Sequence, residues 1–138
     1  TGFGTGNYNG VKVFDGDLKE FELADVKILS EVLTLIKGSS NTGGSNIYST
    51  ATAKGAKVVL VAEDTVTNEK EFIEFGVTDD GSNIFHTEYG NLRTNYQIVV
   101  PTFEFTATNE ARLNITLGAN VPATNTVKIT FSSTITKK

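Results

Sequence analysis

Cysteine, methionine and tryptophan are all absent from this sequence, and histidine occurs once, at position 86. Without cysteine, neither a disulfide framework nor a thiolate metal site can form, and catalytic thiol chemistry is excluded. A single histidine also rules out a multi-histidine metal site within one chain. No cofactor is therefore expected, and with no nucleophile or supporting group implied, the chain is predicted not to be an enzyme.

The sequence also lacks a strong excess of either charge, and it lacks long apolar runs. The net charge is -4 and the Lys and Arg residues are scattered, so neither nucleic acid nor an anionic membrane is an expected partner. No apolar run approaches a membrane span, and the opening TGFGTGNYNG lacks the regions of a secretory signal. We expect a soluble chain, and the small first residue, Thr1, suggests a complete small protein.

The clearest pattern lies between Thr126 and Thr136, where Val127, Ile129, Phe131 and Ile135 alternate with polar residues, and it predicts a strand. Similar alternation covers residues 99–107 and 111–117. The run from Ala56 to Ala62 (AKVVLVA) is nearly continuous, which predicts a central strand covered on both faces. About seven or eight short strands separated by turn residues predict an all-β, antiparallel β-sandwich or jelly-roll-like fold.

The segment from Glu69 to Gly90 predicts a hairpin whose strands each have one apolar face. Matching the apolar sides places Val77 opposite Phe85, and Asp79 opposite Asn83, with a three-residue loop at 80–82. A two-residue Asp80-Gly81 turn would mix apolar and polar residues on one face. In the favoured register the odd-numbered residues build the core, and His86 and Glu88 point outward.

Three other segments carry weaker signals. Residues 1–10 hold four glycines, with Phe3 and Tyr8 between them, and predict a flexible arm; residues 11–23 predict an edge hairpin. Asp25 to Lys37 fits either a helix or a strand, with strand favoured. Gly38 to Ser45 predicts a mobile loop. The predicted organisation is an arm and edge hairpin at 1–23 followed by a sandwich domain at 24–138.

Few residues suggest chemistry. Asp64, Asp79, Asp80 and Glu88 are loop-proximal carboxylates, but their spacing matches no calcium loop, so turn roles are favoured. His86 and Glu88 stand two apart and could form an acid–base pair, although a solvated sheet face is the preferred interpretation.

Three aromatic residues, Tyr89, Tyr96 and Phe103, could form a platform for sugar rings. The favoured register places Tyr89 in the core, and Tyr96 stays open as a loop residue. Carbohydrate is therefore a less favoured ligand.

The order of KGAKVVLVAED, KEFIEFGVTDDGSNIFHTEYGNL, PTFEFTAT, ARLNITL and NTVKITFSSTI is similar to a β-sandwich module of tailed-phage virion proteins, common in marine and cyanobacterial phages. The similar region runs from about Thr50 to Ile135, and the motifs are packing residues rather than chemical groups. The resemblance implies a structural protein located in the virion.

We therefore expect a capsid decoration or cement protein that binds other virion proteins, namely major capsid or tail subunits, and copies of itself through repeated contacts. A tail or fibre component, or a host-surface or carbohydrate-binding module, is the alternative. The candidate interface residues are Phe3, Tyr8, His86, Glu88 and Tyr96.

Overall fold

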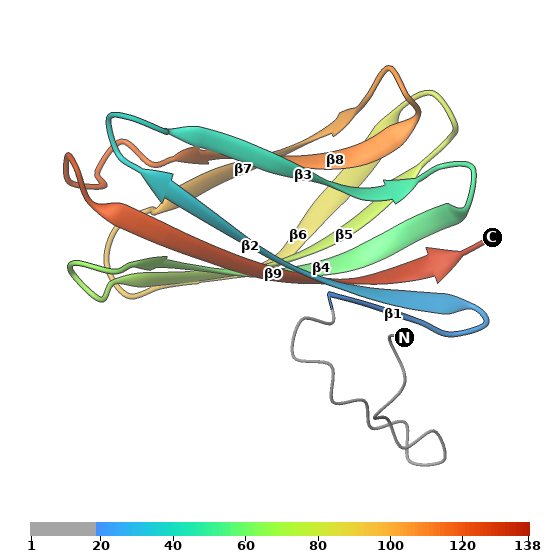
Figure 1. Cartoon of the computed structure of the whole chain (residues 1–138), viewed down its shortest axis with the longest axis horizontal. Coiled ribbons are helices and arrows are strands. Elements are labelled where there is room, and N and C mark those ends of the chain that lie inside the picture. Colours follow the sequence, from blue (N-terminus) through green and yellow to red (C-terminus); the bar gives the residue numbers. More distant parts are fainter. Residues whose placement is uncertain (1–18) are drawn as a thin grey trace, which may run out of the picture.

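The computed structural model describes residues 19–138, which form nine strands in two stacked antiparallel sheets (Figure 1). The strands are β1 (Glu20–Glu22), β2 (Val26–Ile36), β3 (Thr42–Ser49), β4 (Ala53–Asp64), β5 (Lys70–Asp79), β6 (Ile84–Arg93), β7 (Val99–Phe105), β8 (Glu110–Leu117) and β9 (Thr126–Lys137). The predicted antiparallel β-sandwich is confirmed. The predicted arm and the first strand of the predicted edge hairpin lie outside the described residues.

The two sheets differ in width. Six strands form one sheet in the order β1-β2-β9-β4-β5-β6, and three form the other in the order β3-β8-β7. Figure 1 shows the smaller sheet lying over the wider one. Strand β3 contacts β2, β9 and β4, whereas β7 packs over β5 and β6, where Phe103 contacts Phe75 and His86. Because three strands cannot cover six, the margins of the wider sheet are less completely covered on their inner side.

The core lies between the sheets and follows the predicted alternation. In β9 every second residue from Val127 to Ile135 is buried, and the residues between them, such as Lys128 and Thr130, face solvent. The fully or almost fully buried apolar side chains include Val58, Leu60, Ala62, Ile73, Phe75, Ile98, Val99, Leu113, Ile115, Ile129 and Phe131. Burial of these side chains provides the main driving force for folding.

Strand β4 is central, as predicted, but the expectation that both of its faces are covered is wrong. Val58, Leu60 and Ala62 are buried against the other sheet, whereas Val61 on the opposite face is 36% exposed and Val59 is half-buried. Among residues 19–138, nothing therefore covers the outer half of the apolar run AKVVLVA.

The segment with two interpretations, Asp25 to Lys37, contains strand β2, so the favoured choice is confirmed. The predicted loop Gly38 to Ser45 is only partly a loop, because β3 begins at Thr42 and pairs with β8. Gly44 lies close to β8: a Cβ there would come within 2.7 Å of the Leu113 carbonyl oxygen. The glycines that suggested mobility instead permit close approach of two strands.

The predicted register of the β5–β6 hairpin is wrong by one residue. Thr78 pairs with Phe85 and Val77 with His86, so the turn contains four residues, 80–83, rather than three. A bulge then places Glu88 opposite Phe75 and Gly90 opposite Glu74, with Tyr89 as the extra residue.

Alternation in β6 misled the prediction because β6 is the edge strand of the wider sheet. Phe85 and Tyr89 are 53% and 68% exposed, so apolar character there does not mark the core side. In β5 the expectation holds, since Ile73, Phe75 and Val77 are all buried.

Candidate functional site

The acidic turn between β5 and β6 uses its carboxylates for local structure. Asp80 Oδ1 accepts hydrogen bonds from the backbone N–H groups of Asn83 (2.7 Å) and Ser82 (2.9 Å), and these bonds lower the pKa of Asp80. Asp79 accepts a hydrogen bond from the Tyr48 hydroxyl (2.7 Å) and another from Gly81 N (2.9 Å). The turn therefore has the Asx geometry of a structural turn.

His86 and Glu88 do not point away from the core as the sequence predicted. His86 pairs with the buried Val77, so both side chains lie on the inner side of the sheet. The His86 ring is 5.0 Å from the ring of Phe103 in β7, although His86 itself is exposed at the rim. Glu88 likewise pairs with Phe75. An interface role for His86 and Glu88 remains a prediction, now located at the rim between the sheets.

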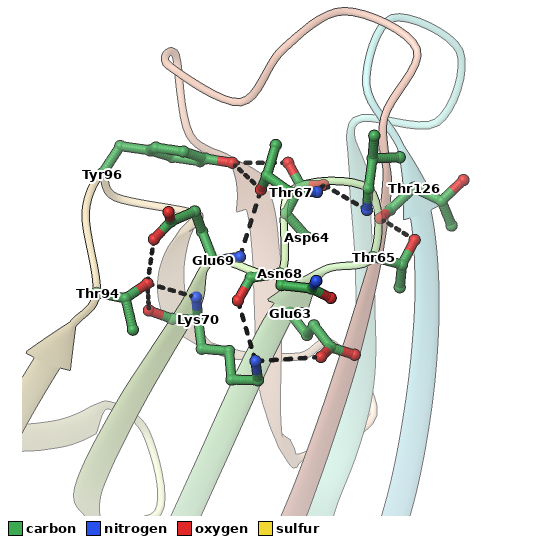
Figure 2. Close-up of polar contacts among 11 residues, drawn as sticks. Glu63, Asp64, Thr65, Thr67, Asn68, Glu69, Lys70, Thr94, Tyr96 and Thr126 are labelled. Carbon is green, nitrogen blue, oxygen red and sulfur yellow. Dashed lines mark hydrogen bonds and ion pairs between the residues drawn. The ribbon is translucent and has the colours of Figure 1, made fainter.

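Tyr96, the open loop aromatic, belongs to a polar cluster at the β4–β5 turn (Figure 2). Asp64 is fully buried and its carboxylate accepts hydrogen bonds from the Tyr96 hydroxyl (2.7 Å) and from Asn125 Nδ2 (3.0 and 3.1 Å). The backbone N–H groups of Val66 and Thr67 also donate to Asp64 Oδ1. Asp64 therefore holds three separate segments together.

These bonds determine the ionisation of the cluster. Burial raises the pKa of Asp64, but hydrogen bonds from Asn125, Tyr96 and the backbone outweigh burial and hold it below its ordinary value. Burial, together with the neighbouring Asp64 carboxylate, raises the pKa of Tyr96. Asp64 is thus a charged structural anchor whose oxygens are already occupied.

The same end of the sheet has a second set of contacts around Thr94. Lys70 N donates to Thr94 Oγ1 (2.8 Å), and the Thr94 hydroxyl donates to Glu69 (Figure 2). Lys70 Nζ lies 3.0 Å from the Asn68 carbonyl oxygen and 3.5 Å from a Glu63 carboxylate oxygen. These contacts attach the segment after β6 to the β4–β5 hairpin.

Glu71 is a buried acid that sequence reasoning missed. Its side chain is fully buried, and Oε1 accepts hydrogen bonds from Ile98 N (2.9 Å) and Val99 N (3.1 Å) at the start of β7. Oε2 binds Arg93 Nε (2.7 Å) and Asn91 Nδ2 (3.1 Å). The signal was present, because Glu71 has the same parity as Ile73 and Phe75 and therefore points inward.

The most distinctive surface is the outer face of the six-stranded sheet, which turns away from the smaller sheet. Among the described residues, eleven large hydrophobic side chains are exposed, and eight of them lie on this outer face. They are Ile28, Val32, Ile36, Val61, Phe72, Phe85, Tyr89 and Leu92. Leu92, Phe72 and Val61 occupy paired positions on three neighbouring strands, and exposed apolar surface of this kind marks interaction sites in soluble proteins.

Strand pairing aligns four of these side chains in a row. Leu92 pairs with Phe72, and Phe72 pairs with Val61. Val61 pairs with Thr130, which in turn pairs with Val32. We call this line the apolar row, and it crosses five strands from β6 to β2.

The outer face of the three-stranded sheet has a different character. Arg112 Nε donates to Asn114 Oδ1 (3.0 Å) and Arg112 Nη1 to Asn46 Oδ1 (3.2 Å), while Asn46 Nδ2 donates to Glu110 Oε2 (3.0 Å). Val100 is the one large hydrophobic residue on this face that is exposed in the described part of the chain, at 40%.

Tyr89 and Phe85 create a local aromatic site at one end of the wider outer face. Two shallow depressions flank Tyr89, one lined by Phe85, Thr78 and Thr87 and the other by Lys57, Thr134 and Thr136. The Tyr89 ring covers Gly76, where a Cβ would lie only 2.7 Å from the tyrosine hydroxyl. The sequence-based placement of Tyr89 in the core is therefore wrong.

Within residues 19–138 no helix has the length and apolar character needed to span a membrane.

Comparison with protein-family models and with curated proteins gives no match. Solved structures give five matches, and phage tailspikes are among them. The tailspike protein of Acinetobacter baumannii phage AM24 superposes with a TM-score of 0.51 at 12% identity, covering 82% of this chain and 26% of that chain.

Two further matches have lower scores. Tailspike gp49 of Acinetobacter baumannii bacteriophage Fri1, a capsular polysaccharide depolymerase, gives a TM-score of 0.43 at 12% identity, covering 86% of this chain and 21% of that one. The tailspike of Acinetobacter phage vB_ApiP_P1 gives 0.44 at 10% identity, covering 92% and 26%. The chain thus spans about a quarter of the tailspikes that it matches.

These findings define a class by fold alone: a β-sandwich like one part of a phage tailspike. They give no support to the marine or cyanobacterial origin implied by the sequence resemblance. They also correct the expectation that the chain is not an enzyme, because one matched protein is a capsular polysaccharide depolymerase. At 12% identity the likeness assigns this chain no activity.

Proposed function

We propose that this chain is a β-sandwich module of a phage tail spike or tail fibre. The sequence analysis favoured capsid decoration and held a tail or fibre component as its alternative; the alternative is the better supported of the two. The observation that carries the proposal is the sandwich fold, because 82% of the chain superposes on part of a phage tailspike. In this role the module contributes contacts to neighbouring virion proteins.

The structure supplies a surface suited to such contacts. The outer face of the wider sheet is apolar in its middle, whereas the outer face of the smaller sheet is covered by a hydrogen-bonded polar network. A module that makes protein contacts on one side and faces water on the other needs this asymmetry.

Immunogold electron microscopy of virions of the encoding phage tests the location. Antibodies raised against the full chain should label the tail tip or its fibres. Labelling distributed over the capsid would restore the decoration hypothesis, and unlabelled virions would overturn both.

A second candidate function, glycan binding, is favoured by the aromatic site around Tyr89. Exposed Phe85 and Tyr89 rings lie beside threonine hydroxyls, a combination that suits the apolar and polar faces of a sugar ring. Titration of the full chain with capsular oligosaccharides, followed by NMR, should shift signals of Tyr89 and its neighbours. Tyr89→Ala should abolish these shifts while Phe72→Ala, on the same face, preserves them; shifts unaffected by Tyr89→Ala would remove this candidate.

A further inference from the structure

We propose that the outer face of the six-stranded sheet is the packing surface for a second copy of this chain, with the two sheets face to face across the apolar row. The proposed self-association does not depend on whether the chain belongs to a tail or to a capsid. The occupant is inferred from apolar pattern, area and charge.

One face of β4 is apolar but is left uncovered by the described residues. A strand in which both faces are apolar is normally covered on both sides. Here Val58 and Leu60 are covered by the smaller sheet, while Val61 is exposed and aligned with Phe72 and Leu92. A second sheet placed over the apolar row would give β4 the two-sided cover that its composition requires.

The outer face is also large enough for a stable interface. Five neighbouring strands spaced about 4.8 Å apart span about 24 Å, and eight to ten residues along each strand span about 30 Å. The resulting face of on the order of 700 Å² per copy is close to the roughly 800 Å² that each partner contributes to a standard stable interface.

The charges that flank the apolar row are complementary between two copies. A line of paired residues flanks the apolar row on each side, and both lines cross β5, β4 and β9. One line consists of Lys70, Glu63 and Lys128. The other consists of Glu74, Val59 and Ser132. A two-fold axis along the apolar row places each of these flanking lines over the other. Lys70 of one copy then lies over Glu74 of the second copy, and the same contact recurs by symmetry.

This arrangement avoids a common obstacle to self-association. The whole chain carries a net charge of -4, but the face itself alternates in sign through the ion pairs Lys70–Glu63 (3.5 Å) and Lys57–Glu74 (2.6 Å). Like-charge repulsion between two copies is therefore low at this surface.

Sedimentation analysis of the full chain tests the proposal. We expect a species of twice the chain mass of 14.8 kDa at micromolar concentration. Val61→Lys places a charge in the middle of the apolar row and should raise the dimer dissociation constant by about 100-fold. Val100→Lys is the matched control, because Val100 has similar exposure (40% against 36%) but lies on the other sheet, and it should leave the dimer intact.

A charge-exchange pair tests the predicted symmetry. Lys70→Glu alone places two acids together, and Glu74→Lys alone places two lysines together, so each variant should dimerise at least about 10-fold more weakly. Mixing the two variants brings opposite charges together in both contacts and should restore the dimer. Thermal unfolding of each variant should remain cooperative, since all these side chains are at least partly exposed.

Three results would overturn the proposal. They are a monomeric full chain at all concentrations up to about 200 µM, a dimer that Val61→Lys does not weaken, and a mixed pair that fails to associate. If the chain is monomeric and Phe72→Lys instead weakens binding to an oligosaccharide, the outer face binds a glycan and not a second copy.

Discussion

The two sheets turn different surfaces away from the core. The outer face of the three-stranded sheet is a polar network centred on Arg112, Asn46 and Asn114, whereas that of the six-stranded sheet has a central row of Leu92, Phe72, Val61 and Val32. Both faces are built from alternating strands with similar inner sides. The two sheets thus differ mainly in the side chains that they present to solvent.

Within the wider sheet, the residues that stabilise the fold and the residues available for contacts with a partner lie on opposite sides. Residues on the inner side, together with the buried acids Glu71 and Asp64, hold one chain together. Residues on the wider outer face contribute less to the folded monomer, because they are only partly buried. Substitutions on the two sides of one strand should therefore have different effects.

The largest effect is expected at Phe75, which is 2% exposed and packs edge-to-face on Phe103 at 5.2 Å. Phe75→Ala should lower the free energy of unfolding by about 3 to 5 kcal/mol through lost burial and a new cavity. Chemical denaturation measures the loss. Phe72→Ala, on the other side of β5, is the control and should cost less than about 1 kcal/mol in the monomer; equal losses would show that the outer face is part of the core.

The next effect is expected at Glu71. Glu71→Gln removes the charge that binds Arg93 and disturbs the acceptor for two N–H groups of β7, so it should cost about 2 to 3 kcal/mol. Glu74→Gln, on the exposed side of the same strand, should cost less than about 1 kcal/mol. A Glu71→Gln variant as stable as the native chain would show that Glu71 does not hold the two sheets together.

A smaller effect is expected from acid. The pKa of Asp64 is lower in the folded chain than in the unfolded chain, so its stabilising contribution is present above its ordinary pKa of about 3.9 and is lost as pH falls through the folded value. Unfolding measured between pH 7 and pH 2 should show this loss below about pH 4. Asp64→Asn should be less stable at pH 7 and should lose less on acidification; parallel pH profiles would contradict the assignment.

The smallest effect is expected on the polar outer face. Arg112→Ala removes hydrogen bonds that are partly exposed, so the free energy of unfolding should change by less than about 1 kcal/mol. The same variant should leave self-association unchanged. A large change in either quantity would show that the smaller sheet, too, carries a functional surface.

Much of the sandwich could be predicted from the sequence because most strands have one wet and one covered side. Alternation from Val127 to Ile135 predicted β9, and the parity of Ile73, Phe75 and Val77 predicted the inner face of β5. These strands lie where the two sheets overlap or next to that region, and there the apolar side is the inner side.

The failures come from positions where that rule does not hold. In β6 the apolar Phe85 and Tyr89 point outward and the bulge at Tyr89 shifts the register, neither of which alternation can reveal. In β3 the glycines suggested a loop, because their role depends on contacts with β8 that are remote in sequence. The outer face itself required knowledge of which strands are neighbours.

Hydroxyl-radical footprinting of the full chain at low and high concentration is the most direct test of the central claim that a second copy covers the wider outer face. Phe72 and Leu92 should become protected as concentration rises from about 1 to about 200 µM, while Val66, a turn residue as exposed (66%) as Leu92 (72%), should not change. Equal reactivity of Phe72 and Leu92 at both concentrations would contradict the claim.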